Sequence, residues 1–340
     1  MSLTVVETAG GQAAVEGEGG KAIEGRSPWR LAFDRVRSDR VAIIAVVLIV
    51  LMILLAVLAP LIAGLVGHGP TDTNLDTGTD ASGQPLGPGS SGYVLGTDNL
   101  GRDILVRLAY GAQISLVVGV LATLLATVAG VAIGLVAGYF GGWIDTLLAR
   151  FMDVILSFPY VLFAIAVVSV YGASLLLTII VIAFFSFAAI GRIVRGQALS
   201  QKEKEYVEAA HSLGAGNLRI MFIDILPNLV APVIVLATLL IPVAIVFEAT
   251  LSYLGVGIKP PTPSWGNMLA DAQGTGYGAW WFWVFPSLFL LITTLGFNLL
   301  GDSVRDALDP RSERLFAARG VKRRQKRVRK QKGTPAKAST

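Results

Sequence analysis

The sequence contains no cysteine and only two histidines among its 340 residues. Without thiols, disulfides, thiolate nucleophiles and zinc–thiolate sites are excluded. The motifs G-x-x-x-x-G-K-[ST], H-E-x-x-H and G-x-S-x-G are also absent. The chain therefore lacks the loop that cradles nucleotide phosphates, and we expect it neither to bind ATP in this way nor to be an enzyme.

Charge is scarce as well. Charged residues make up 15% of the chain, whereas soluble domains carry about 25%. They are missing altogether from five blocks, which are residues 41–59, 108–144, 154–191, 225–247 and 272–301. A helix needs about 20 apolar residues to cross a bilayer, and a central charge costs about 2.5–3.5 kcal/mol. The sequence therefore predicts an all-α, polytopic helical membrane protein.

Six transmembrane helices are predicted, at about 41–61, 112–139, 144–170, 174–194, 229–254 and 281–301. The third is the least regular, because Asp145, Arg150 and Asp153 fall in its first half and Pro159 would kink it. An alternative is a surface helix over 143–157 followed by a shorter insertion. His68 and His211 fall in loops on opposite sides of the membrane, so they cannot form one site.

The distribution of basic residues predicts the orientation. Six of the 28 Lys and Arg precede Val41, and 13 follow Gly301. Because basic residues concentrate on the cytosolic side, both termini are predicted to be cytosolic, which requires an even number of spans. Only Arg102, Arg107 and Lys259 then lie outside.

The chain divides into a cytosolic tail with an interfacial helix (1–40), a first transmembrane helix (41–61) and an extracellular loop with a short helix (62–111). A core domain (112–301) holds five more transmembrane helices and the cytosolic loop 196–228. A basic cytosolic tail (302–340) follows. Eight of the 11 residues in 322–332 are basic, which favours contact with anionic membrane lipid. No nucleic-acid-binding motif accompanies them, so no nucleic acid is expected as a partner.

The polar loop contains the sequence EKEYVEAAHSLGAGNLRIMFIDILPNL (203–229). Helical spacing over 203–213 places Tyr206, Ala209, Ala210 and Leu213 on one face. Gly214 is predicted to end this helix with a left-handed conformation. Asn217 is predicted to cap a second short helix, in which a single apolar stripe contains Leu218, Met221, Phe222 and Ile225. The small, acidic surface around Glu208, Ala209 and Ala210 suits a groove on another protein, although such a helix could simply close a loop.

The segment EAAHSLGAGNLRIMFIDILP resembles the EAA loop of ABC-importer permeases, matching at Glu208-Ala209-Ala210, Gly214 and Ile225-Leu226-Pro227. Three further segments resemble the C-type permease subunit of dipeptide and oligopeptide importers. They are LGTDNLGRDILVRLAYGAQISL (95–116), GYFGGWIDTLLARFMDVILSFP (138–159) and EATLSYLGVGIKPPTPSWGNML (248–269). Asp224 departs from the family pattern, which often has a basic residue or histidine there, and the two tails are longer than usual.

This resemblance implies a cytosolic coupling helix that docks into an ATPase, with Tyr206, Glu208, Ala209, Ala210, Leu213 and Gly214 at the contact. It also implies a cell-membrane location and four partner chains. These are a sister permease forming a heterodimer, two cytosolic P-loop ATPases that hold ATP and Mg, and an extracellular peptide-binding protein. No cofactor is expected in this chain. Relatives that carry nickel or glycopeptides share the motifs, so another solute remains an alternative, and an ion-coupled carrier is a more distant one.

Two features are predicted near the outer face. Thr97 or Asp98 would cap a short helix, stabilised by the i, i+4 pairs Asp98–Arg102 and Asp103–Arg107. That helix would contact the binding protein or the peptide, or would only stabilise itself. Glu248 lies near the outer end of the fifth span, where it either snorkels to the rim or lines a cavity or gate.

Glycines recur every four residues in the second span, at 130, 134, 138 and 142. This spacing allows close approach of a neighbouring helix. Packing is therefore predicted for them in preference to a pore-lining role.

Overall fold

The computed structural model describes residues 28–90, 92–275 and 277–308. Within these ranges the chain is helical, with a few isolated β-bridges and no extended strand. The predicted tails, including the basic stretch 322–332, lie mostly outside the described residues. The helices are α1 (Pro28–Ser38), α2 (Arg40–Val57), α3 (Ala59–Val66), α4 (Leu75–Gly78), α5 (Ile104–Phe140), α6 (Gly142–Ser157), α7 (Tyr160–Tyr171), α8 (Leu175–Lys202), α9 (Glu205–Ser212), α10 (Asn217–Arg219), the π-helical turn η1 (Ile220–Ile225), α11 (Leu226–Tyr253), α12 (Trp265–Ala272), the 3-10 turn η2 (Tyr277–Ala279) and α13 (Trp280–Leu308).

Five helices in the described part of the chain are long and apolar enough to cross a membrane. They are α2, α5, α8, the continuous helix from Asn217 to Tyr253, and α13. A sixth span exists if α6 and α7 count as one, although they are bent by 85°. The bend falls at Phe158 and Pro159, where proline interrupts the helix as predicted. An all-α, polytopic membrane protein with five or six candidate spans is thus confirmed, and the predicted third span is divided into two helices by a sharp bend.

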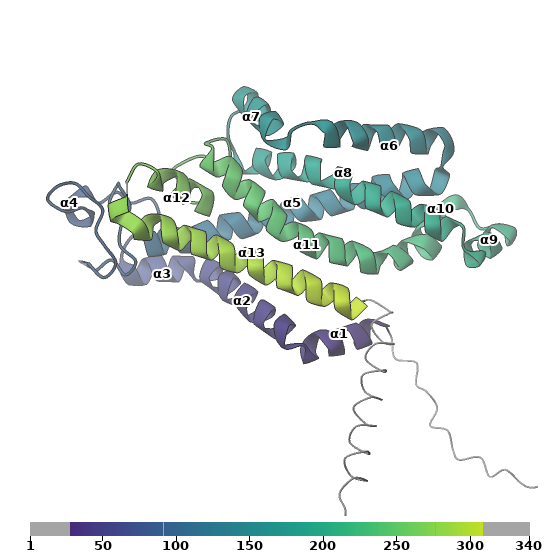
Figure 1. Cartoon of the computed structure of the whole chain (residues 1–340), viewed down its shortest axis with the longest axis horizontal. Helices are drawn as coiled ribbons and strands as arrows, with labels where there is room; N and C mark the ends of the chain where they lie inside the picture. The colour runs from purple at the N-terminus through teal and green to yellow at the C-terminus, as the bar shows by residue number, and fades with distance from the viewer. Residues whose placement is uncertain (1–27, 91, 276, 309–340) are drawn as a thin grey trace, which may run out of the picture.

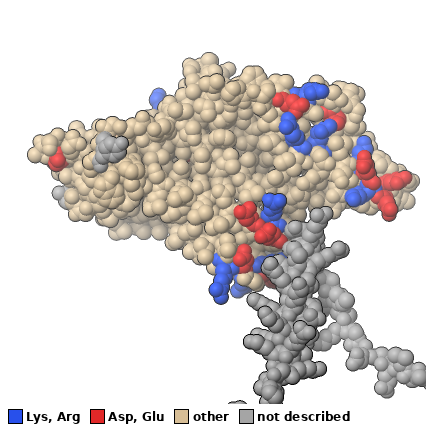
Figure 2. All heavy atoms as spheres, viewed as in Figure 1, with Lys and Arg blue, Asp and Glu red and all other residues tan. Residues whose placement is uncertain are grey.

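The two aspartates that made the third span irregular pair with arginines of α8, which runs beside α6, while Arg150 lies 3.7 Å from Asp153 on α6 itself. Asp145 forms a bidentate ion pair with Arg195, and Asp153 pairs with Arg192. Figure 2 shows this charged group on the surface toward the end of the molecule that carries α9. The middle of the same face has almost no charged residues, as the apolar belt of a membrane protein requires.

The helices α5 and α8 pack at close range along a row of glycines. A Cβ on Gly134 would lie 2.5 Å from the backbone oxygen of Gly191, and one on Gly138 would lie 2.6 Å from the Cβ of Ala198. Gly130 meets Ile190 in the same way. The packing role predicted for these three glycines is confirmed. Gly142 is different, because it begins α6 and has open space around it.

The two described ends of the chain lie together at one end of the bundle (Figure 1). The Arg35 guanidinium donates to the carbonyl of Ala307 at 3.0 Å, and the Ser303 hydroxyl lies 3.1 Å from the Asp39 carboxylate. The helix α1 leads directly into α2, as expected for residues preceding the first span. At the opposite end of the bundle lie α3, α4 and α12 (Figure 1).

Candidate functional site

The short helix α9 (Glu205–Ser212) forms the tip of the molecule at the end of α8 (Figure 1). The helix stops where predicted, because Gly214 has φ +78°, a conformation that side chains with a Cβ rarely adopt. The amide of Gly214 donates to the carbonyl of His211 at 2.9 Å, and that of Ala215 donates to Ala210 at 3.0 Å. These bonds satisfy carbonyls at the helix end and fix a tight turn.

The outward surface of α9 is acidic and small, with one large apolar residue at its end. Glu205, Glu208 and Ala209 are exposed, Ala210 is half-buried, and Leu213 is 88% exposed. Figure 2 shows acidic and basic side chains gathered at this tip. The predicted contact residues Glu208, Ala209, Leu213 and Gly214 therefore lie together on an accessible surface.

Tyr206 lies on α9 and is 41% exposed, and its hydroxyl also forms hydrogen bonds within the chain. Its hydroxyl donates to the Gln201 side chain at 2.9 Å and accepts from the Asn228 amide at 3.3 Å. Partial burial raises the pKa of Tyr206, which favours the protonated phenol that makes the first of these bonds. Val207 beside it is fully buried. Tyr206 thus ties α9 to the ends of α8 and α11, with its ring still partly exposed.

The segment after Gly214 corrects two predictions. Asn217 does not cap a helix, since Gly216 precedes α10 without a side-chain cap, and the Asn217 amide oxygen instead accepts from the Tyr139 hydroxyl at 2.9 Å. The predicted apolar stripe is also divided. Met221 and Ile225 are buried, whereas Leu218 and Phe222 are 68% and 55% exposed. The π-helical turn explains the division, because its wider repeat moves side chains off the 3.6-residue stripe.

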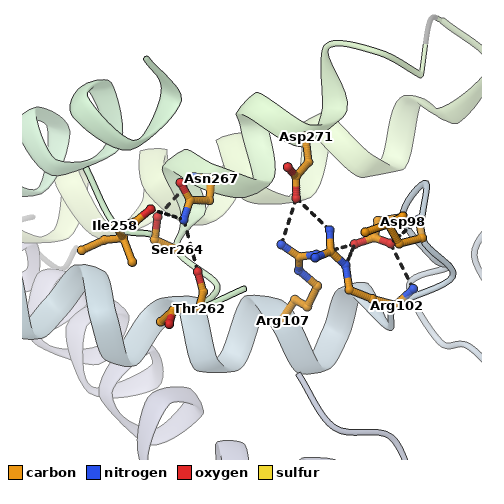
Figure 3. Close-up of polar contacts among 9 residues, drawn as sticks. Asp98, Arg102, Arg107, Ile258, Thr262, Ser264, Asn267 and Asp271 are labelled. Atoms are coloured by element: carbon orange, nitrogen blue, oxygen red, sulfur yellow. Dashed lines mark hydrogen bonds and ion pairs between the residues drawn. The ribbon is translucent and has the colours of Figure 1, made fainter. Parts of the chain in front are cut away.

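A buried ion cluster lies at the opposite end, where the loop before α5 meets α12 (Figure 3). Asp98 accepts from Arg102 at 2.6 Å and from Arg107 through the same oxygen. Both guanidiniums also donate to the carboxylate of Asp271 on α12, at 2.8 and 3.1 Å. The three residues Asp98, Arg102 and Arg107 are almost fully buried, and Asp271 is 31% exposed. The cluster joins the loop before α5 to α12.

The short helix predicted to be capped by Thr97 or Asp98 does not form, because residues 98–103 are a loop and α5 begins at Ile104. The pair Asp98–Arg102 forms as predicted, but Asp103 does not pair with Arg107. Asp103 instead caps α5, accepting from the amides of Leu105 and Val106 at 2.8 and 3.2 Å. Its second oxygen lies 3.4 Å from His68. Capping by Asp103 is why α5 starts eight residues earlier than expected.

Glu248 is fully buried on α11, so it does not snorkel to the membrane rim. Its two oxygens accept from the hydroxyls of Ser115 at 2.7 Å and Ser252 at 2.8 Å. Ser252 in turn accepts from the amide of Ile258 at 3.1 Å. Asn267 holds the same loop by donating to the carbonyls of Ile258 and Thr262 (Figure 3). Glu248 thus links α5 and α11 to the loop that leads into α12.

Comparison with known proteins identifies the family of this chain. The sequence profile of the binding-protein-dependent transport system inner membrane component matches residues 130–314. The chain belongs to this family. Residues 27–85 match the N-terminal TM domain of oligopeptide transport permease C. The matched region of the first profile contains α9 and the turn at Gly214.

Curated relatives of this permease family extend over most of the chain. The dipeptide transport system permease protein DppC of Alkalihalophilus pseudofirmus is 42% identical over 84% of this chain and 90% of its own length. The oligopeptide transport system permease protein OppC of Escherichia coli K12 is 40% identical over 85% of this chain and 93% of its own length. The glutathione transport system permease protein GsiD of an Escherichia coli strain is 47% identical over 64% of this chain and 71% of its own.

A solved structure has the same fold. It is a chain of the MetNI methionine ABC transporter in inward-facing conformations, with a TM-score of 0.51 and 16% identity. The match covers 60% of this chain and 96% of the other. At this identity the similarity concerns the arrangement of helices alone.

Proposed function

We propose that this chain is the permease subunit of an ATP-driven importer of dipeptides or oligopeptides. It forms half of the translocation path beside a sister permease, receives its solute from an extracellular binding protein, and places both termini in the cytosol. ATP and Mg belong to two partner ATPases. The names of the dipeptide and oligopeptide permeases among its relatives support the choice of solute.

The observation that carries this proposal is the position of α9. An exposed helix of eight residues ends in a left-handed glycine and lies between two long spans. Its outer surface is small at Ala209 and acidic at Glu208, so a groove on another protein can approach its backbone closely. A helix that is held at both ends and exposed between them suits the transfer of motion from a cytosolic partner to the spans.

The buried polar residues at the opposite end of the molecule have a structural role. Asp98, Arg102 and Glu248 are buried, and their polar atoms are engaged within the chain. Buried ionic groups need such partners, so these residues act by fixing the outer surface. Direct contact with the solute or the binding protein falls to the exposed residues of that end, and the side chain of Asp271, which is 31% exposed, lies where the ion cluster meets that surface.

The test is recruitment of the ATPase subunits by variants of the α9 segment in the co-expressed transporter. Glu208→Lys reverses an exposed charge, and Gly214→Val forces a β-branched residue into the left-handed region. The matched control is Gly216→Val, since Gly216 also has open space around it but an extended backbone. We expect at least a tenfold loss of co-purified ATPase with the first two variants and little with the control.

Normal membrane levels of all three variants are required for this comparison. Full ATPase recruitment and full uptake of a labelled dipeptide by Glu208→Lys and Gly214→Val would show that α9 only closes a loop. A second outcome is that ATPase recruitment depends on α9 but the transporter takes up neither dipeptides nor longer peptides. This outcome would support the coupling role of α9 and contradict the proposed solute.

A further inference from the structure

We propose that Tyr139, at the cytosolic end of α5, is a positioning residue that couples α9 to the transmembrane bundle. This inference rests on the proposed function, in which α9 receives the ATPase. Tyr139 is 4% exposed although it lies beside the exposed tip of the molecule. The side chains that cover it come from three other elements, α8, α9 and α10.

The contacts of Tyr139 involve both its ring and its hydroxyl. The imidazole of His211 on α9 is nearly parallel to the ring, at 9° and 6.3 Å between centroids. The Lys202 ammonium at the end of α8 lies 5.8 Å from the ring centroid, within the range of a cation–π contact. The hydroxyl donates to Asn217 on α10 at 2.9 Å. One side chain therefore contacts the elements on both sides of the Gly214 turn.

The element that carries Tyr139 explains why this contact matters. The helix α5 has 37 residues, which corresponds to about 55 Å at a rise of 1.5 Å per residue. It packs against α8 without side chains between their backbones at Gly134 and Gly138. A displacement of α9 that reaches Tyr139 is thus passed to a long, closely packed pair of helices, and it arrives at the ion cluster around Arg107 on the other side of the membrane.

The other attachments of α9 do not provide this path. Tyr206 joins α9 to Gln201 and Asn228, which belong to the helices directly before and after the loop. Val207 is buried in the hydrophobic core beneath α9. Tyr139 is the residue of the distant helix α5 whose ring and hydroxyl contact His211 on α9 and Asn217 on α10, so its loss should leave α9 folded and exposed but loosely connected to α5.

The experiment uses the complete transporter with its ATPases, purified and reconstituted, and takes advantage of the absence of native cysteine from this chain. Two introduced cysteines, Ser212→Cys on α9 and Val128→Cys on α5, carry spin labels at exposed positions. Pulsed electron paramagnetic resonance measures the distance between them with and without ATP. Dipeptide uptake per ATP hydrolysed is measured on the same preparations. The variants are Tyr139→Ala and Tyr139→Phe, with Trp143→Ala as an exposed aromatic control at the same end.

We expect one narrow distance distribution for the parent protein, unchanged by ATP. Tyr139→Ala should retain ATPase co-purification within twofold but broaden the distribution and shift it on ATP binding, with at least a tenfold loss of uptake per ATP. Tyr139→Phe keeps the ring, so its uptake per ATP hydrolysed should fall less than threefold. Trp143→Ala should match the parent protein.

Two results would overturn the proposal. One is a narrow, ATP-independent distance and normal coupling in Tyr139→Ala. The other is a parallel loss of membrane level, ATPase association and uptake, which would make Tyr139 a simple folding residue. The failure of the proposed function is separate, because it would be seen as intact ATPase association in Glu208→Lys, whatever the α9–α5 distance does.

Discussion

Asp98 and Arg107 are nine residues apart and form an ion pair with side-chain exposures of 0% and 2%. The same carboxylate oxygen also faces Arg102, so one acid is shared by two guanidiniums, and Asp271 supplies the second negative charge from α12. The loop, α5 and α12 are therefore held by three nearly buried charges and by Asp271, which is partly exposed. Such an arrangement depends strongly on each of its members.

Asp98→Asn should destabilise the protein substantially, because it leaves two cations in a buried site with one partly exposed acid. Removing one partner of a buried pair typically costs about 3–5 kcal/mol. Asp271→Asn should cost less, since its carboxylate is already 31% exposed. Thermal unfolding of the purified protein in detergent measures both, with the exposed Asp76→Asn as control. Equal melting temperatures for Asp98→Asn and the control would contradict this account.

Gly134→Ala should loosen the α5–α8 contact. Its Cβ would lie 2.5 Å from the backbone oxygen of Gly191, which cannot move aside as a flexible side chain would. Overpacking of this kind costs about 1–3 kcal/mol. Gly196→Ala on α8 is the matched control, because nothing lies within 4 Å of its Cβ position. Unfolding temperatures should fall for the first variant only. A Gly134→Ala protein as stable as the control would show that the two helices can separate at little cost.

Glu248→Gln should be nearly as stable as the parent protein, whereas Glu248→Ala should not. The amide of glutamine can accept from one serine and donate to the other, since a hydroxyl takes either role. Alanine instead leaves the buried hydroxyls of Ser115 and Ser252 without this partner, at about 1–3 kcal/mol for each group left unsatisfied. Melting temperatures distinguish the two variants, with Glu205→Ala on exposed α9 as a reference. Equal decreases in melting temperature for Glu248→Gln and Glu248→Ala would indicate that the negative charge itself is needed.

Reporter fusions to Ser2 and Thr340 should give the same cytosolic signal. The basic residues favour this orientation, and the contact between Arg35 and Ala307 brings the two described ends to one end of the bundle. Alkaline phosphatase, active outside, and a fluorescent protein, active inside, report the side of each terminus. Signals on opposite sides would reject the even number of spans.

Local patterns in the sequence predict several features correctly because they depend on few residues. Charge-free blocks of span length identify the membrane helices, since a bilayer excludes charge regardless of the neighbours. Gly214 ends α9 where predicted, because the left-handed turn is a property of one residue and its adjacent backbone. The spacing of Gly130, Gly134 and Gly138 likewise indicates a close helix contact, although it does not identify α8 as the partner.

The tertiary structure decides what depends on partners far away in the chain. Asp103 has the same spacing to Arg107 as Asp98 has to Arg102, but it caps α5, and Arg107 turns to Asp98 and to Asp271, 164 residues further along. Glu248 is buried because Ser115, 133 residues away, supplies a hydroxyl. Asn217 is of a residue type that is preferred at helix N-caps, but its side chain accepts a hydrogen bond from Tyr139 instead. Sequence spacing shows which groups are neighbours within one helix. A buried polar group, however, needs a hydrogen-bond partner, and that partner is often a residue far away in the sequence that only the packing of the helices brings close.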